Sequence, residues 1–212
     1  MCVIIVKSTE QKIPAKSILS QCWDSNPDGA GIALTSGDKV LILKGLMTKT
    51  DFLAACREIP KKSTALIHCR IGTSGYLDSG ATHPFPISSK INEMTASYIK
   101  TDAAVCHNGI IPWLSYHHKY SDTQLFCRDY LSQFTTEQLQ SSTVLGLIHQ
   151  AIGTGNKLAF LFPHKFQLLG KFAELKGCFY SNLNFLFSQF SQKEKNEEDY
   201  QLVDLPPYNY LD

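Results

Sequence analysis

The grouping of short apolar segments is the feature that most constrains the fold of this chain. Runs rich in Val, Ile, Leu and Phe recur along the sequence between turn residues, and segments with helical spacing fall between groups of these runs. Short apolar runs bounded by turn residues predict β-strands. A parallel, doubly wound sheet would require strands and helices to alternate strictly. The grouping therefore favours an α+β protein in which stacked sheets are flanked by helices.

The predicted strands include one clear hairpin. Ala30–Thr35 and Lys39–Lys44 flank Ser36-Gly37-Asp38, which has the composition of a tight turn. The other expected strands span residues 2–7, 63–70, 101–107, 157–162, 166–169 and 177–180.

Four segments carry helix signals. Pro14 suits the first turn of a helix with Leu19 and Trp23 on its apolar face. Thr48-Lys49-Thr50-Asp51 has the form of a capping box, and Ser121 is a candidate N-cap. A further helix is expected over 136–152. We expect residues 1–190 to form one domain and residues 191–212, which are polar, acidic and then proline-rich, to form a loosely held tail.

Composition excludes several classes of function. A length of 212 residues suits one domain, and a formal net charge of +1 argues against a nucleic-acid or membrane surface built on bulk charge. No apolar run approaches the roughly 18 to 20 residues of a membrane span. The first residues lack the features of a secretory signal, so a cytoplasmic protein is expected. The seven cysteines form no CxxC pair and, apart from Cys2, are expected to be small buried hydrophobic residues.

Cys2 is the cysteine whose position suggests chemistry. If Met1 is removed, the α-amine and the thiol belong to the same residue. An α-amine with a pKa of roughly 7.7 to 8.0 can act as the base for a thiol whose pKa is about 8.5. From position alone, however, a cysteine that begins a buried strand is the more frequent explanation.

Three other polar positions have both a chemical and a structural explanation. Arg70 ends a predicted strand before a glycine-rich loop, so it can bind a carboxylate or form an ordinary ion pair. Asn108 and Gly109 can donate to an oxyanion or simply form a turn. Asp122 lies at a helix start, where a carboxylate usually stabilises the helix N-terminus.

Together these segments resemble the class II glutamine amidotransferases, which are N-terminal-nucleophile (Ntn) glutaminases. The resemblance covers roughly the first 130 residues and is strongest toward the short, stand-alone members. It rests on motifs in the family's order: Cys2, NPDGAGIA at 26–33, HCRIGTSG at 68–75, THPF at 82–85, HNG at 107–109 and SDT at 121–123. It implies a four-layer αββα sandwich of the Ntn-hydrolase type.

The resemblance also implies a site for L-glutamine. Cys2 would attack the side-chain amide carbon, and Asn108 and Gly109 would stabilise the oxyanion. Arg70, assisted by Thr73, would bind the α-carboxylate of the substrate. Asp122 would bind its α-ammonium, so that one fixed cation and one fixed anion orient the zwitterion.

Two departures from the family bear on where the ammonia goes. Ile71 and Ser74 occupy positions at which the family often has Trp and His, which puts a standard ammonia channel in doubt. No synthetase domain follows, so the expected acceptor is a synthetase or ligase on a separate chain. No cofactor is implied.

Two other functions stay open on the sequence alone. One is another Ntn amidohydrolase that acts on a different amide, and the other is a catalytically silent regulatory or binding domain of the same fold. A metal site is not expected, because neighbours such as His68/Cys69 and Cys106/His107 point to opposite faces of a strand.

Overall fold

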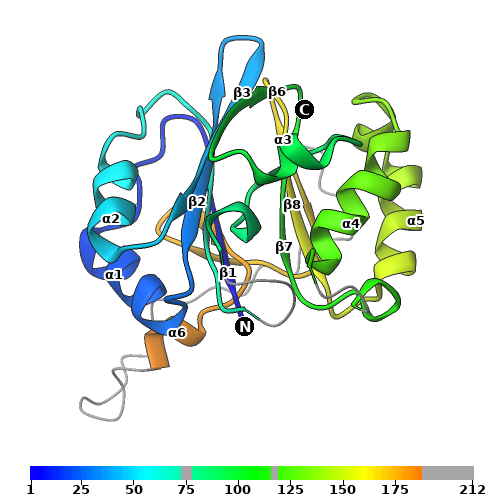
Figure 1. Ribbon diagram of the computed structural model, residues 1–212. Helices are drawn as coiled ribbons and strands as arrows, with labels where there is room; N and C mark the ends of the chain where they lie inside the picture. Colours follow the sequence, from blue (N-terminus) through cyan, green and yellow to red (C-terminus); the bar gives the residue numbers. More distant parts are fainter. Residues whose placement is uncertain (73–77, 116–118, 188–212) are drawn as a thin grey trace.

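A computed structural model of the protein describes residues 1–72, 78–115 and 119–187. Two antiparallel sheets stack face to face, and helices cover both outer faces (Figure 1). The predicted tail at 191–212 lies outside the described residues, as do Thr73 and Ser74.

The larger sheet has seven strands and the smaller sheet has four. The order in the larger sheet is β10 (Ala173–Leu175), β11 (Cys178–Tyr180), β1 (Val3–Lys7), β4 (Ala65–Cys69), β2 (Ala30–Ser36), β3 (Lys39–Leu46) and β6 (Tyr98–Thr101). The order in the smaller sheet is β5 (Phe85–Pro86), β7 (Ala104–Asn108), β8 (Lys157–Leu161) and β9 (Phe166–Leu169). Strand β1 therefore lies inside the larger sheet, antiparallel to both β11 and β4.

The helices are divided between the two outer faces (Figure 1). The larger sheet is covered by α1 (Lys16–Ser25), α2 (Lys49–Arg57) and α6 (Asn184–Phe187). The smaller sheet is covered by α4 (Asp122–Asp129) and α5 (Ser142–Ile152). The remaining helical pieces are α3 (Ile91–Thr95), η1 (Ser79–Ala81), η2 (Pro112–Leu114), η3 (Leu131–Gln133) and η4 (Gln138–Gln140).

Strand alternation explains the three apolar layers. Ile5 of β1 packs under α1 and α2, whereas Ile4 and Val6 face the smaller sheet and contact its inner residues. On β7, Cys106 lies between the sheets and Val105 packs under the helices of the smaller sheet. Because successive strand side chains point to opposite faces, every central strand contributes to two layers. The predicted αββα sandwich is confirmed.

Some predicted boundaries were wrong. The helix expected over 136–152 is split, because η4 precedes an α-helix that begins only at Ser142. Three strands, β5, β6 and β10, were not predicted, and neither were helices α3 and α6. Strand β6 has no fully buried position, so its sequence lacks the apolar signal of the central strands. These edge elements are fixed by pairing with neighbours that the local sequence does not specify.

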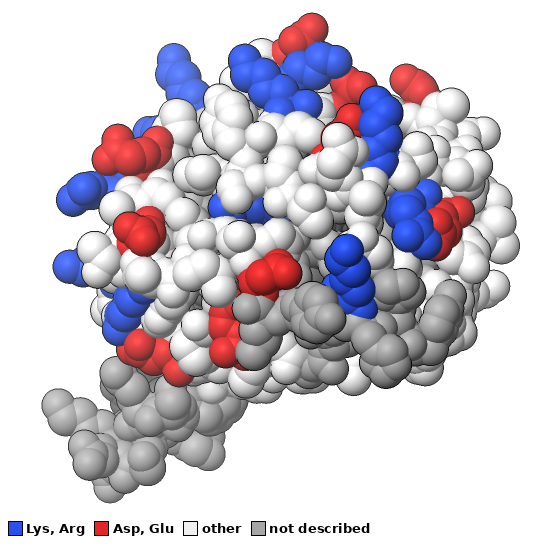
Figure 2. All heavy atoms as spheres, viewed as in Figure 1, with Lys and Arg blue, Asp and Glu red and all other residues white. Residues whose placement is uncertain are grey.

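Charged side chains of both signs are interspersed on the face shown in Figure 2. In that view, Lys and Arg residues lie beside Asp and Glu residues rather than forming an area of one sign. Within the described part of the chain, no helix has the length and apolarity that a bilayer crossing requires.

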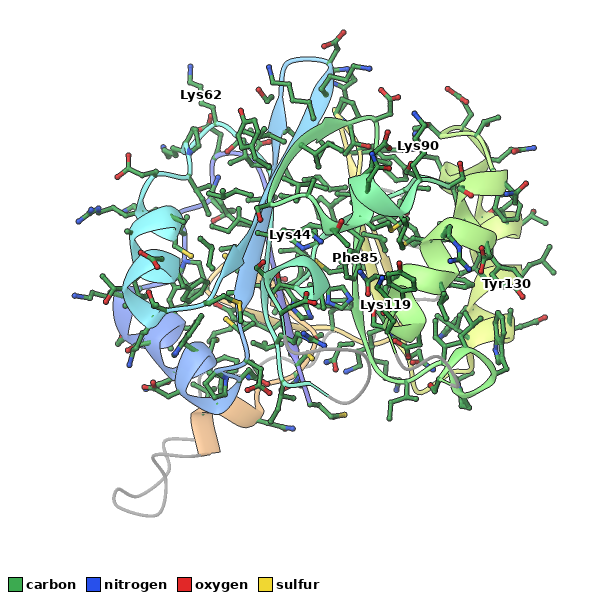
Figure 3. All side chains as sticks on the ribbon, viewed as in Figure 1. Lys44, Lys62, Phe85, Lys90, Lys119 and Tyr130 are labelled. Atoms are coloured by element: carbon green, nitrogen blue, oxygen red, sulfur yellow. The ribbon has the colours of Figure 1, made fainter. Side chains whose placement is uncertain are left out.

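One lysine is buried in the interior of the molecule. Lys44, on β3, is 2% exposed, and its Nζ lies 4.2 Å from the ring centroid of Phe85 (Figure 3). The Nζ donates to the carbonyls of Gly80, at 2.8 Å, and Met94. Burial lowers the pKa of Lys44 to about 7.

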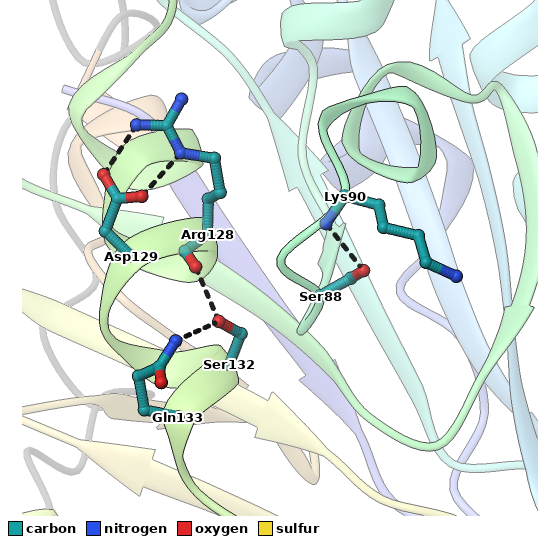
Figure 4. A network of polar contacts seen from close by, with 6 residues as sticks. All are labelled: Ser88, Lys90, Arg128, Asp129, Ser132 and Gln133. Atoms are coloured by element: carbon teal, nitrogen blue, oxygen red, sulfur yellow. Dashed lines mark hydrogen bonds and ion pairs between the residues drawn. The ribbon is translucent and has the colours of Figure 1, made fainter.

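Helix α4 is held at both ends. At its start Ser121 and Gln124 form a complete capping box, as the N-cap prediction requires. At its end Arg128 donates twice to the carboxylate of Asp129, and the Ser132 hydroxyl donates to the Arg128 carbonyl (Figure 4). The helix that begins with Asp122 is therefore a firm support for that carboxylate.

Candidate active site

Cys2 lies immediately before β1, at the lower end of the sandwich in Figure 1. Its Sγ is 3.3 Å from both the N–H and the carbonyl of Ile71, so the thiol lies against the loop that follows β4. The side-chain amide of Asn182 donates to the Cys2 carbonyl at 2.7 Å. The thiol is partly buried against Ile71, and the Cys2 backbone is held by Asn182, so distant parts of the chain position this residue.

Burial is the main influence on the Cys2 thiol, and it raises the pKa above the ordinary value. The Ile71 N–H, the N-terminal ammonium and the Arg70 guanidinium oppose this effect, in that order of size. The balance leaves the thiol protonated at neutral pH, so an attack by sulfur requires a nearby base. While Met1 is present, the α-amine belongs to Met1 rather than to Cys2.

Asn108 and Gly109 end the central strand of the smaller sheet and face the same region. Asn108 is 4% exposed, and its Nδ2 donates to Ser181 Oγ at 2.8 Å. Gly109 has a φ of +151°, and a Cβ there would lie 2.0 Å from Oδ1 of Asn156. Only glycine fits at this turn, because its backbone must approach the Asn156 side chain closely.

A cavity of about 320 Å³ joins the predicted nucleophile to the predicted oxyanion donors. Its lining consists of Met1, Cys2, Asn108, Gly109, Ile110, Gly155 and Asn156. The strands that carry these groups belong to different sheets, so stacking of the sheets creates the cavity. Three of the six predicted site residues, Cys2, Asn108 and Gly109, thus line the same cavity.

Arg70 lies directly after β4 and is 3% exposed. It does not line the cavity of Cys2. Burial lowers the pKa of the guanidinium, and Cys2, Asp28 and Asp122 oppose this shift in part. The Asp28 carboxylate accepts the Gly72 N–H at 2.8 Å, so the NPDGAGIA segment supports the loop that Arg70 enters.

Asp122 is buried, and its carboxylate already accepts hydrogen bonds from two backbone N–H groups. Its Oδ2 accepts the Ile111 N–H at 2.8 Å, and its Oδ1 accepts the Thr123 N–H at 2.7 Å. The carboxylate therefore fastens the turn after Gly109 to the start of α4. It does not line the cavity, although its charge opposes the lowering of the Arg70 pKa.

Three residues near the cavity were missed in the sequence. Asn156 contacts Nε2 of His107, on β7, through Oδ1 at 2.7 Å, and its Nδ2 donates to the Ile152 carbonyl. Ser181 and Asn182, directly after β11, bond to Asn108 and Cys2. The only local signals were the turn composition of 153–156 and a polar pair at a strand end, which are common features of loops.

The histidines beside the strands are neutral structural groups. His68 lies between the sheets with its Nε2 3.2 Å from the His107 carbonyl, and burial lowers its pKa to about 3. Its neighbour Cys69 packs on the opposite face, under the helices of the larger sheet. Among the described residues, no group of three or more His, Cys, Asp or Glu side chains is arranged to hold a metal ion.

Comparison with known proteins identifies relatives by fold only. No protein-family model matches the chain, and neither does any curated protein. Glutamine phosphoribosylpyrophosphate amidotransferase from B. subtilis, in complex with ADP and GMP, is similar in structure with a TM-score of 0.49 and 17% identity. A structure of the allosteric regulatory enzyme of purine biosynthesis has a TM-score of 0.50 and 17% identity.

Each alignment covers 85% of this chain and 41% of the other, so the chain spans about two fifths of the length of those structures. At 17% identity the likeness establishes the fold and not the chemistry. The stacked antiparallel sheets with outer helices are those of the Ntn-hydrolase type.

Proposed function

We propose that this protein hydrolyses L-glutamine to glutamate and ammonia with Cys2 as the nucleophile. The observation that carries the proposal is the shared cavity of Cys2, Asn108 and Gly109 within a sandwich of the Ntn-hydrolase type. A thiol, a side-chain amide and a backbone N–H around one cavity supply a nucleophile and two oxyanion donors.

The proposed chemistry begins once Met1 has been removed. The thiol proton passes to the α-amine of Cys2 as Sγ attacks the amide carbon, and the carbonyl oxygen becomes an oxyanion that Asn108 and Gly109 stabilise. The carbon–nitrogen bond then breaks, and the proton on the α-amine goes to the leaving nitrogen. Ammonia departs and leaves a γ-glutamyl thioester on Cys2.

Water completes the reaction. The α-amine removes a proton from water as the oxygen attacks the thioester carbon, and the second tetrahedral intermediate uses the same two donors. The carbon–sulfur bond breaks, glutamate leaves, and the proton returns to sulfur. The net reaction consumes one water and one glutamine.

Substrate binding in this proposal uses two buried charges that are not part of the cavity lining. Arg70 binds the α-carboxylate with help from Thr73, and Asp122 binds the α-ammonium. The support is electrostatic: Arg70 interacts with both Cys2 and Asp122. The Asp122 carboxylate accepts from the Ile111 N–H and from the N–H and hydroxyl of Thr123, so about one of its roughly four lone-pair sites is left for the α-ammonium.

We further propose that ammonia is passed to a synthetase or ligase on another chain. Ile71, whose backbone contacts Cys2 Sγ, replaces the family's usual Trp beside the nucleophile. An acceptor that docks at this site would therefore meet an aliphatic side chain rather than an indole. Glutamine hydrolysis itself does not require that indole.

The test is glutamate release from L-glutamine by the wild type and by Cys2→Ala. We expect Cys2→Ala to lose activity by at least about 10³-fold, since the attacking atom is gone. The matched control is Cys56→Ala, which changes another buried cysteine, on α2, and should leave activity intact. Equal glutamate release by wild type and Cys2→Ala would refute the proposal.

Two further measurements separate the alternatives. Intact mass establishes whether Met1 has been removed, and retention of Met1 in active protein would exclude the α-amine of Cys2 as the base. Competition with simple acyl amides tests substrate choice. A glutaminase should prefer glutamine, whereas strong inhibition by acyl amides without a charged α-carbon would point to another Ntn amidohydrolase.

A further inference from the structure

Ser181 directly follows β11 and is completely buried. Its N–H donates to the Ile4 carbonyl at 2.9 Å, one step beyond the pairing of Ile5 with Tyr180. The antiparallel pairing of β1 with β11 is thus extended to within two residues of Cys2.

The Ser181 side chain takes part in this last step. The Ile4 N–H donates to Ser181 Oγ at 2.9 Å, so the hydroxyl oxygen serves where a backbone carbonyl would continue the ladder. The Ser181 carbonyl instead accepts from Lys157 Nζ, on β8 of the smaller sheet. The residue therefore connects the two sheets through its backbone.

The same oxygen makes a second connection between the sheets. Asn108 Nδ2, at the end of β7, donates to Ser181 Oγ at 2.8 Å. A hydroxyl oxygen accepts two hydrogen bonds, so Ile4 and Asn108 use its full acceptor capacity. Ser181 Oγ thus links β1, which begins just after Cys2, to the side-chain amide of Asn108.

We propose that Ser181 is a positioning residue for the oxyanion donor Asn108. This inference rests on the proposed glutaminase function and deepens it. One hydrogen of the Asn108 amide is bound by Ser181 Oγ, which holds the amide plane, and Asn108 lines the cavity of Cys2, where the second hydrogen can serve as the oxyanion donor. Preorganisation of such a donor stabilises the transition state more than the ground state.

The first test is steady-state kinetics of Ser181→Ala and Ser181→Cys. Alanine removes the acceptor, and cysteine keeps the shape of the side chain but offers only a weak acceptor. We expect each variant to lower kcat roughly 10- to 100-fold with KM changed by less than about threefold, because the lost effect belongs to the transition state. Unchanged kcat in both variants would overturn the inference.

The second test is a double-mutant cycle with Asn108→Ala. If Ser181 acts through Asn108, then adding Ser181→Ala to Asn108→Ala should lower kcat by less than about twofold further. Multiplication of the two single effects would show that Ser181 acts independently of the amide and would contradict the inference.

Ser63→Ala is the matched control for the loss of a buried serine hydroxyl. Ser63 is 5% exposed, and its Oγ donates to the Pro60 carbonyl at 2.8 Å at the far end of β1. Thermal unfolding of both alanine variants is compared with their kcat. If kcat falls in proportion to the loss of thermal stability in both Ser63→Ala and Ser181→Ala, then Ser181 has only a structural role.

A measurement without substrate keeps this inference distinct from the proposed function. In nuclear magnetic resonance, the Asn108 side-chain amide hydrogens should exchange slowly with water in the wild type and faster in Ser181→Ala. Unchanged exchange refutes the positioning role even if the protein hydrolyses glutamine. Faster exchange in Ser181→Ala than in the wild type supports the positioning role. This holds even if the wild type proves inactive on glutamine and the proposed function is refuted.

Discussion

The two ends of β1 are held in opposite ways. At the far end, Lys7 is buried and its Nζ donates to the carbonyls of Pro60 at 3.3 Å, Lys61 at 2.7 Å and Ser63 at 2.6 Å. At the near end, the neutral side chains of Asn182 and Ser181, which follow β11, hold Cys2 and Ile4, and Cys2 lines a cavity of about 320 Å³.

This difference suggests that the Lys7 end of β1 contributes to stability and the Cys2 end to the proposed chemistry. Hydrogen bonds from a charged donor are stronger than neutral ones, so the Lys7 end is a tight anchor for the 60–63 turn. The Cys2 end adjoins a cavity that Asn108 and Gly109 also line, and a substrate needs such a space. We therefore expect substitutions at the two ends to change different measured quantities.

Apart from loss of the nucleophile itself, the largest effect at the Cys2 end is expected for Gly109→Ala. The new Cβ would lie 2.0 Å from Asn156 Oδ1 at a φ of +151°, so the turn must shift and move an oxyanion donor. We expect kcat for glutamine hydrolysis to fall about 100-fold or more. Gly37→Ala is the control, because its φ is +62° but no atom lies within 4 Å of the new Cβ. Comparable losses of activity in both variants would contradict this explanation.

Lys7→Met should change stability and not activity. Three carbonyls lose their charged donor, and we expect the free energy of unfolding in urea to fall by about 2 to 4 kcal/mol. The kcat of the folded protein should stay within about twofold of the wild type. Lys39→Met removes an exposed ion pair with Asp102 and should change stability little. A large fall in kcat for Lys7→Met would end the proposed separation.

Asp122→Asn should affect both quantities, because its carboxylate joins the turn after Gly109 to α4. An amide cannot accept both the Ile111 and the Thr123 N–H through separate oxygens. We expect KM for glutamine to rise about 10-fold as the counter-charge for the α-ammonium is lost. Thermal unfolding separately measures the loss of stability caused by breaking the link between the turn and α4. An unchanged KM with lowered stability would remove Asp122 from the substrate site.

A separate effect, on stability alone, concerns the pH dependence at Lys44. Its pKa is lowered to about 7 in the folded protein from an ordinary 10.5, so the unfolded chain binds more protons between these values. Stability should therefore rise with pH through this window, by up to about 1.4 kcal/mol per pH unit, and lose this dependence below pH 7. Urea unfolding between pH 7 and 9 should show a shallower slope for Lys44→Met. Parallel slopes for the two proteins would contradict the lowered pKa.

Much of the fold was predictable because its signals are local. The turn at Ser36-Gly37-Asp38 predicted the β2–β3 hairpin, and the apolar run of β1 predicted a buried strand. Edge pieces such as β6 and β10 escaped prediction, because their pairing depends on neighbours far along the chain.

The sequence by itself determined where the apolar runs and turns lie along the chain. It also placed Gly109 in a turn and contained the motifs from Cys2 to Asp122. Only the tertiary structure decided which of these groups share a cavity and what holds them there. Ser181 meets Asn108 across 73 residues and Ile4 across 177 residues. Contacts at such separations are set by strand register and by the stacking of two sheets, and no local pattern of residues encodes either one.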